Sequence, residues 1–333
     1  MQKPVIGITM GDAAGIGPEI SCKSLKNVFI FEKCNPFILG DTKVIKQIIN
    51  ICNLNLKINS VKNIKECQYK FGTIDVLDYD DIDIEKLKFG VVDSMCGKAA
   101  VKYVKEAGQM AMESKIQAIV SAPFNKESMR AAGYNYEGQT EILGELAKSK
   151  NYGMMLILDN LRIMMYSTHM SLRKACDKVT YEEILQKIIL ANEGLRFFNL
   201  KNPIIAVSAL NPHAGEGGLF GNEEIDYIIP AIKKAREMKI NVVGPVPADI
   251  VFVKAKNGEY DLVLAMYHDQ ANMAVKLLGF GNVVTLLVGL PIIRTSTGHG
   301  TAFDIAGKNV ADETNLIKAI KLAAELSDKY KRS

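Results

Sequence analysis

The feature that most limits what this chain can fold into is an alternation of apolar runs of strand length with helix-like segments. The apolar runs lie at Leu161–Tyr166, Ile204–Leu210 and Leu262–Tyr267. Helix-like segments separate them, at Tyr181–Phe197 and Glu223–Lys239. Because strands that alternate with helices form mostly parallel sheets, the sequence predicts an α/β protein.

The rest of the chain continues this pattern. Further strand candidates are Val5–Met10, Pro36–Gly40, Thr73–Leu77, Ala118–Ser121 and Val283–Leu290, and helix candidates are Thr42–Ile51 and a segment that starts at Gly97. A chain of 333 residues is long for a single hydrophobic core, so we expect two domains.

Composition and charge exclude several classes of protein. The 41 basic and 37 acidic residues leave a net charge of +4, and the lysines are spread out, which argues against a nucleic-acid partner. The six cysteines form no C-x-x-C pair, a usage typical of reduced thiols in the cytosol. The sequence shows no secretory leader and no apolar run of membrane-spanning length. We therefore expect a cytoplasmic protein with no membrane partner.

Three of the four histidines follow the three apolar runs described first. They are His169, His213 and His268, and the carboxyl ends of parallel strands lie at one edge of a sheet. A single histidine usually has another role, but three at one edge predict a metal site with an open position, as in catalytic sites. Imidazole suits Zn, Co, Ni or Fe better than Mg or Ca. Asp249 is either a further ligand, a group that orients a ligand, or a turn aspartate.

Other polar residues at the ends of strand candidates allow two interpretations each. Lys126 follows Ala118–Ser121, where it would meet an anionic substrate or lie in solvent at the start of a helix. Thr140 either caps a helix or contacts a ligand. The glycine-rich turn Gly11–Ile20 either cradles an anion or needs its glycines for geometry alone.

Two runs are expected to be neighbouring strands that deliver one site. Leu262–Tyr267 ends in a histidine, and Val283–Leu290 leads into Arg294 and then into residues 299–301. Lys276 lies between the two runs in a helix-like segment. Ligands of open α/β sheets bind beyond the carboxyl ends of the strands, so these residues are candidates for ligand binding.

Ten motifs in a fixed order carry a resemblance to a known family. They are GDAAGIGPEI, SAPFNKE, GQTEIL, STHMSLRK, NPHAGEGGLFGNEE, GPVPAD, YHDQ, LLGFG, GLPIIRTS and HGTAFDIAGK. Together they resemble the 4-hydroxythreonine-4-phosphate dehydrogenase family of vitamin B6 synthesis, which includes relatives that act on 4-phospho-threonate and 4-phospho-erythronate. The resemblance runs from Gly7 to about Leu326. The last motif also resembles a segment of isopropylmalate dehydrogenases.

The resemblance implies an isocitrate- and isopropylmalate-dehydrogenase-like fold, with two α/β/α lobes and a central cleft. The first lobe would be discontinuous and would contain residues 1–125 and 300–333. The second lobe, residues 126–299, would carry the metal ligands and the dimer contacts. A homodimer is implied, with the active site at the interface, which lets His268 act in the site of the partner subunit.

The resemblance also implies an activity, NAD- or NADP-dependent oxidation and decarboxylation of a 4-phosphorylated four-carbon 3-hydroxy acid. His169, His213 and His268 would hold a divalent metal, with zinc favoured and cobalt, manganese and magnesium as alternatives. The general base stays open between Asp249, Lys126 and water. The implied substrate residues are Gln139, Thr140, Lys276, Thr285 and Arg294, and the implied dinucleotide residues are His299, Gly300, Thr301 and Asp304.

Three positions depart from the family pattern. Ala13 stands for a proline, Gln139 for a substrate-binding histidine and Thr285 for a substrate-binding asparagine. An uncharged amide cannot supply a cationic contact, so the last two changes predict a shifted substrate. Several motifs are closer to the phospho-threonate relatives than to the vitamin B6 enzyme. The alternatives are a phosphate acyltransferase of related fold and a non-catalytic ligand-binding homologue.

Overall fold

The computed structural model describes residues 3–329, which form two compact units. We call residues 3–150 with 290–329 the terminal unit and residues 151–289 the central unit. The resemblance implied boundaries near residues 125 and 299, and the two compact units are divided after residues 150 and 289. Each unit contributes six strands and is described by itself.

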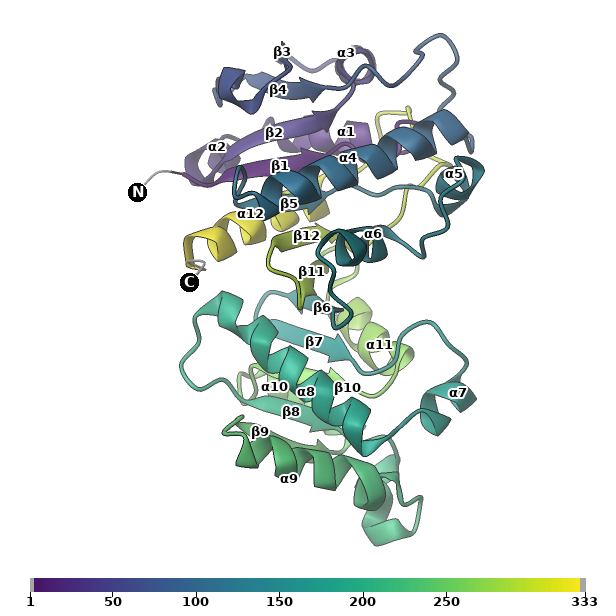
Figure 1. Ribbon diagram of the computed structural model, residues 1–333, viewed down its shortest axis with the longest axis vertical. Coiled ribbons are helices and arrows are strands. Elements are labelled where there is room, and N and C mark those ends of the chain that lie inside the picture. The colour runs from purple at the N-terminus through teal and green to yellow at the C-terminus, as the bar shows by residue number, and fades with distance from the viewer. Residues whose placement is uncertain (1–2, 330–333) are drawn as a thin grey trace. The chain divides into compact units, whose positions relative to one another are not determined.

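The terminal unit is built on six parallel strands in the order β3-β4-β2-β1-β5-β12 (Figure 1). The strands are β1 (Val5–Thr9), β2 (Asn35–Gly40), β3 (Lys57–Val61), β4 (Thr73–Asp78), β5 (Ala118–Ser121) and β12 (Ile293–Thr297). Gly7 pairs with Phe37 of β2 on one side and with Ile119 of β5 on the other, so β1 is central. All of β5 is buried, as expected of a parallel strand covered on both faces.

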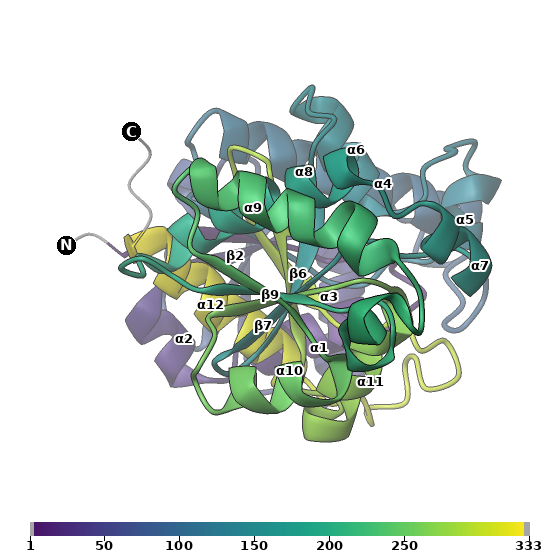
Figure 2. The ribbon, with the colours of Figure 1, turned by 90° about the horizontal axis from the view of Figure 1, so that it is seen from below.

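Helices cover both faces of this sheet. They are α1 (Gly17–Ser24), α2 (Val28–Lys33), α3 (Thr42–Ile51), α4 (Ser94–Met112), α5 (Lys126–Ala131), α6 (Gln139–Leu146) and α12 (Thr314–Lys329), with a 3₁₀ turn η1 (Ile64–Glu66). Helix α4 packs on one face against β1, β2 and β5, and α12 packs on the other face against β5 and β12 (Figure 2). The long helix α4 begins after Asp93, whose carboxylate accepts hydrogen bonds from the backbone N–H groups of Met95 and Cys96. This is the usual way to satisfy the free donors at a helix start.

The central unit has six strands in the order β11-β6-β7-β10-β8-β9. The strands are β6 (Gly153–Leu158), β7 (Leu161–Met165), β8 (Ile205–Ser208), β9 (Val242–Val246), β10 (Leu262–Ala265) and β11 (Val284–Val288). The three apolar runs that end in histidines form β7, β10 and β8, which are adjacent and parallel. The prediction that their carboxyl ends share one edge of a sheet is confirmed.

The order of strands corrects one prediction. The runs that form β10 and β11 are not neighbours, because β6 and β7 lie between them. These two strands form an antiparallel hairpin in which Leu158 pairs with Leu161. Asp159, at φ 52°, makes the turn between them. The polar pair Asp159 and Asn160 between two apolar runs was the available signal for this hairpin.

Helices also cover both faces of the central sheet. They are α7 (Leu172–Asp177), α8 (Tyr181–Leu195), α9 (Ile229–Glu237), α10 (Ala248–Lys256) and α11 (His268–Gly279), with η2 (Arg196–Phe198), η3 (Pro212–Gly218) and the π-helical turn η4 (Glu224–Ile228). Helices α8 and α9 lie on one side of the strands, and α10 and α11 lie on the other (Figure 2). Val251, Val263 and Val275 belong to the buried core beneath α10 and α11. Within residues 3–329, no helix has both the length and the apolar character needed to cross a membrane.

Candidate functional site

The central unit brings three histidine-bearing segments to one edge of its sheet. His169 follows β7, His268 is the first residue of α11 directly after β10, and His213 follows β8 in the segment η3. Because β7, β10 and β8 are adjacent and parallel, the side chains start from the same edge. This is the edge at which open α/β sheets bind ligands.

Hydrogen bonds fix the ends of these strands to one another. Ser167 Oγ donates to the carbonyl oxygen of Met266 at 2.9 Å, which joins β7 to β10. The side-chain Oε1 of Gln270 accepts from the N–H of Met266 at 2.7 Å, and its Nε2 donates to the carbonyl oxygen of Ala209 at 3.0 Å, which joins β10 to β8. Ser167 and Gln270 are both buried, and the sequence analysis assigned no role to either. They hold in place the segments that carry the histidines.

Two of the three imidazoles lie side by side. The ring centroids of His169 and His268 are 5.6 Å apart, with the ring planes at 44°. The Nδ1 atom of His268 is 2.7 Å from Oδ1 of Asp269. A proton on Nδ1 is donated to this carboxylate, which leaves the lone pair of Nε2 for a ligand. The His213 ring lies next to the ring of Phe220 instead, with centroids 6.3 Å apart.

The histidines of one chain meet the needs of a divalent metal only in part. Among residues 3–329 of one chain, no three histidine, cysteine, aspartate or glutamate side chains are grouped to hold one ion. His169 and His268 supply two nitrogen donors of the kind that zinc-like ions prefer. Asp249 lies exposed in the first turn of α10. The three-histidine metal site therefore stays a prediction, and a complete donor set needs His213 or a group from outside this chain.

His213 lies in a backbone segment of unusual conformation. Residues 213–217 all have positive φ, and three of them are not glycine: His213 at 53°, Ala214 at 55° and Glu216 at 43°. Left-handed geometry costs about 1–2 kcal/mol for each residue with a Cβ atom. Such conformations persist where surrounding contacts enforce them, and they are concentrated at functional sites.

Two more predicted substrate residues belong to the central unit. Lys276 lies exposed on α11, two turns after His268, and Thr285 is buried in β11 opposite Leu156 of β6. The same helix and the residue after it expose large apolar side chains to solvent. These are Met273, Leu277, Leu278 and Phe280, with 63%, 85%, 42% and 81% of their surface exposed.

The terminal unit contains a buried cation, Arg294 of β12. Only 4% of its surface is exposed. Its Nε donates to Ser121 Oγ at 3.0 Å, and its NH2 group donates to Oε1 of Gln139 at 3.2 Å. Burial lowers the pKa of Arg294 to about 10, while the charge of Glu141 acts in the opposite direction.

Arg294 has neutral partners where a buried charge would ordinarily have an acidic one. No carboxylate in the described part of the chain forms an ion pair with it. A buried charge without a counter-charge is unfavourable. Its guanidinium has five N–H donors, of which Ser121 and Gln139 accept two. The remaining donors, and a charge with no carboxylate in direct contact, make Arg294 a candidate for binding an oxyanion.

Gln139 links this arginine to the end of β5. Its Oε1 accepts from Arg294, and its Nε2 donates to the carbonyl oxygen of Ala122 at 3.0 Å. The prediction that Thr140 caps a helix is wrong, because α6 begins at Gln139 and the capping position is Gly138, which has no side chain. Thr140 is half-buried in the first turn, and its hydroxyl is not used for capping. Lys126 is the first residue of α5 and is exposed.

The predicted dinucleotide residues follow β12 and pack against the glycine-rich turn. The carbonyl oxygen of Thr301 accepts from the N–H of Ile16 at 3.0 Å, and a Cβ atom on Gly15 would be 3.0 Å from Cβ of Thr301. A Cβ atom on Gly300 would meet nothing within 4 Å, so that position faces open space. Asp304 is exposed, and Nδ1 of His299 is 3.0 Å from the carbonyl oxygen of Gly300.

The glycine-rich turn itself has a geometric explanation. Gly11 has φ +76°, and a Cβ atom there would lie 2.2 Å from the carbonyl oxygen of Pro123. The next residue, Asp12, is fully buried. Its Oδ1 accepts from the N–H of Ala14 at 2.9 Å, and burial raises the pKa of its carboxyl group. Strand order reverses between β1 and β5, next to Asp12, so this acid is a further candidate that the sequence analysis missed.

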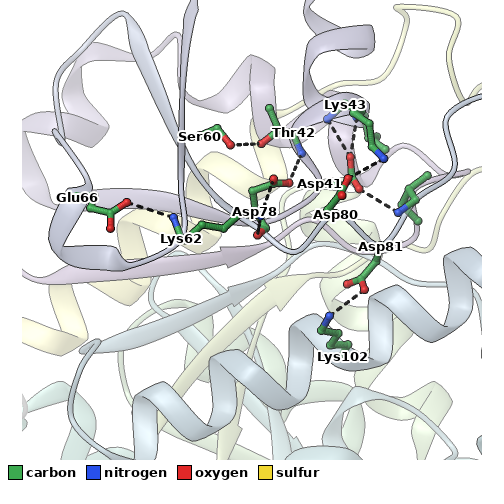
Figure 3. A network of polar contacts seen from close by, with 12 residues as sticks. Asp41, Thr42, Lys43, Ser60, Lys62, Glu66, Asp78, Asp80, Asp81 and Lys102 are labelled. Carbon is green, nitrogen blue, oxygen red and sulfur yellow. Dashed lines mark hydrogen bonds and ion pairs between the residues drawn. The ribbon is translucent and has the colours of Figure 1, made fainter.

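The acidic residue that follows β2 is occupied by structural contacts (Figure 3). Oδ1 of Asp41 accepts from the N–H groups of Lys43 and Val44 at the start of α3, and its Oδ2 accepts from the N–H of Ile82 at 2.9 Å. Many dinucleotide-binding folds use a carboxylate near this place to hold a ribose. Asp41 is fully buried, so it gives no indication of a choice between NAD and NADP.

Known proteins resemble this chain over almost its whole length. A family model described as "Pyridoxal phosphate biosynthetic protein PdxA" matches residues 32–323. A Clostridium botulinum (strain Langeland) protein named "Putative D-threonate 4-phosphate dehydrogenase" is 47% identical over 331 residues, 99% of each chain. Crystal structures of 4-hydroxythreonine-4-phosphate dehydrogenases from Klebsiella pneumoniae and Burkholderia phymatum have TM-scores of 0.92 and 0.87. They are 38% and 42% identical to this chain, and the alignments cover 98% of this chain and 98% and 99% of theirs.

Proposed function

This chain belongs to the PdxA family of pyridoxal phosphate biosynthetic proteins, and from that premise we propose that it oxidises and decarboxylates a 4-phosphorylated four-carbon 3-hydroxy acid with NAD or NADP. The preferred substrate in this proposal is 4-phospho-threonate. The name of the C. botulinum relative supports that choice. Gln139 and Thr285 also support it. They replace a histidine and an asparagine of the family pattern at positions that the resemblance implies contact the substrate.

The observation that carries the proposal is the buried Arg294. A guanidinium held by Ser121 and Gln139, with no carboxylate paired to it in the described residues, is prepared for a phosphate or carboxylate oxygen. An oxyanion that binds there restores the missing counter-charge and accepts charge-assisted hydrogen bonds. We assign to Arg294 the binding and orientation of one charged end of the substrate. Lys276 and Thr140 are proposed to contact the rest of it.

We propose that His169, His213 and His268 hold a divalent metal, with ligands drawn from two copies of the chain. Two observations support this assignment. The rings of His169 and His268 lie side by side, and the carboxylate of Asp269 orients the His268 ring. A metal in such a site lowers the pKa of a substrate hydroxyl and stabilises developing negative charge. The exposed apolar side chains of α11 support a homodimer, since large apolar patches rimmed by polar groups mark interfaces.

The residues around the site have separate tasks in the proposed reaction. Arg294 and Lys276 position the charged ends of the substrate so that its hydroxyl carbon faces the nicotinamide. The segment 299–304, with its open position at Gly300, is proposed to contact the dinucleotide. The hydroxyl proton is taken up by Asp249, Lys126 or water. Activity measurements after replacement of Asp249 and of Lys126 distinguish these three cases.

The test is NADH formation with 4-phospho-threonate, 4-phospho-erythronate and 4-hydroxythreonine 4-phosphate, each with added Zn, Co, Mn or Mg. We expect turnover of the phosphorylated sugar acids and a rise in KM of roughly 10- to 100-fold in Arg294→Lys, because lysine cannot reproduce the fixed guanidinium contacts. Turnover of the amino substrate alone would place the chain in vitamin B6 synthesis. Phosphate-dependent acyl transfer from an acyl-CoA, without NADH formation, would overturn the proposal.

A further inference from the structure

We infer that Glu224 is the positioning residue for His213, because it holds the segment that carries His213 in its left-handed conformation. Glu224 is the first residue of the π-helical turn η4, and only 1% of its surface is exposed. The inference concerns the backbone around His213. Only its metal-binding readout rests on the proposed function.

Both oxygens of the Glu224 carboxylate are directed at the residues just before His213. Oε1 accepts from the backbone N–H groups of Leu210 and Asn211, at 2.9 Å and 2.8 Å. Oε2 accepts from Nδ2 of Asn211 at 2.9 Å. The chain leaves β8 at Ser208, so these three bonds fix the direction in which it enters the His213 segment.

Residues that follow His213 also lie close to the Glu224 carboxylate. A Cβ atom on Gly215 would lie 2.9 Å from Oε2 of Glu224 and 3.0 Å from the carbonyl oxygen of Gly221. The N–H of Phe220 donates to the carbonyl oxygen of Gly215 at 3.2 Å. Glu224 is therefore surrounded by the loop that it organises.

The placement of Glu224 is unfavourable unless these bonds are made. A buried carboxylate needs either a cation or several hydrogen bonds. In the described part of the chain no lysine or arginine pairs with Glu224, so its carboxylate depends on the N–H donors of Leu210 and Asn211, just before His213. A π-helical turn interrupts regular helix geometry and is frequent at functional sites. Here it places the Glu224 side chain under the loop, where it offsets the left-handed strain at His213, Ala214 and Glu216.

The first experiment compares Glu224→Gln with Glu223→Gln in the full-length protein. Glu223 is a matched control, because among the described residues its carboxylate accepts a hydrogen bond from the side-chain Nδ2 of Asn211, at 2.7 Å, and from no backbone donor. Hydrogen exchange of residues 211–221 and calorimetric titration with Co²⁺ are measured on both variants, together with thermal unfolding. We expect faster exchange in Glu224→Gln and Co²⁺ affinity about 10- to 100-fold weaker, the usual effect of losing a group that orients a ligand. Glu223→Gln should stay close to the unchanged protein.

The second experiment uses two glycines with the same backbone conformation. Gly215 and Gly217 have φ of +78° and +67°, but a Cβ atom on Gly217 would meet nothing within 4 Å. Both alanine substitutions add left-handed strain, and only Gly215→Ala also pushes against the Glu224 carboxylate. We expect Gly215→Ala to reproduce the faster exchange of Glu224→Gln, and Gly217→Ala to show a clearly smaller change.

The inference is overturned if Glu224→Gln keeps the exchange of residues 211–221 unchanged, or if both alanine variants loosen this segment equally. If the unchanged protein binds no Co²⁺, the metal proposal fails by itself. The exchange data then still decide the role of Glu224, because they need no metal. If Glu224→Gln does not fold, Gly215→Ala still tests the inference, because this variant retains the Glu224 carboxylate.

Discussion

At the scale of single residues, the proposed anion site depends on the two hydrogen bonds of the Gln139 side chain. Its carbonyl oxygen accepts from Arg294 and its amide group donates to Ala122, so it acts as a spacer between a cation and a strand end. A glutamine is neutral at all pH values, which leaves the positive charge of the site to Arg294 alone. This gives position 139 a role that is separate from direct contact with a substrate.

Replacement of the Gln139 amide by a carboxylate should therefore weaken binding of an anion at Arg294. Gln139→Glu places a carboxylate beside Arg294 and supplies internally the counter-charge that the substrate would bring. We expect KM for the phosphorylated acid to rise by roughly 100-fold, because a charge-assisted hydrogen bond to the ligand is lost. Steady-state kinetics measure it. Gln139→Leu is the control: it keeps the free charge, so its KM should rise less, and an equal rise in both variants would contradict the argument.

The pH dependence of anion binding follows from the same group. Burial lowers the pKa of Arg294 from its ordinary value to about 10. Binding needs the protonated guanidinium, so affinity is constant below this pKa and falls by about tenfold per pH unit above it. Substrate titrations between roughly pH 7 and 11 measure this, since the second phosphate pKa, near 6, lies below that range. A change in affinity between pH 7 and 8 would show that another group on the protein controls binding.

At the scale of elements, α11 combines a histidine at its start with an exposed apolar surface near its end. We expect Leu277→Asp to weaken self-association at least about tenfold, because 85% of this side chain is exposed in one chain and a charge there opposes burial in an interface. Sedimentation velocity over a range of concentrations measures it. Phe29→Asp on α2, where 57% of the side chain is exposed, is the matched control and should leave the mass unchanged. A monomer in the unchanged protein would remove the basis for shared ligands.

Elements were predictable to different degrees, for physical reasons. Apolar runs identified β1, β2, β4, β5, β7, β8, β10 and β11, because strands that are buried on both faces need continuous apolar sequence. The runs could not show pairing, so the β6–β7 hairpin and the separation of β10 from β11 were missed. Strand β12 was missed because Arg294 and several hydroxyl residues interrupt its apolar character.

The site was predictable in the same partial way. Strand ends located the histidines, since the side chains that follow parallel strands must reach one edge of a sheet. Sequence could not reveal which residues fix those strand ends, because Ser167, Gln270 and Glu224 act through backbone atoms of distant residues. The left-handed run at 213–217 was also beyond sequence, since only part of it is glycine.

At the scale of the whole molecule, one unit is continuous in sequence and the other is not. The central unit contains residues 151–289, whereas the terminal unit needs β12 and α12 from the far side of that segment. We expect a fragment of residues 151–289 to unfold cooperatively on heating, because it contains all six strands of the central unit and the helices that cover them. A fragment of residues 1–150 lacks β12, which pairs with one edge of β5, so we do not expect this fragment to unfold cooperatively. Circular dichroism of both fragments measures this, and cooperative unfolding of the N-terminal fragment alone would contradict it.

The discontinuous terminal sheet has a consequence for the newborn protein on the ribosome. The edge of β5 is synthesised long before β12, which begins 172 residues after Ser121 (293 minus 121). At about 5–20 residues per second, this edge waits roughly ten to thirty seconds for its partner strand. A buried apolar strand with free backbone donors and acceptors is then open to wrong pairing with other chains. Chaperone demand during translation should therefore concentrate on residues 1–150, because all of residues 151–289 are synthesised before β12.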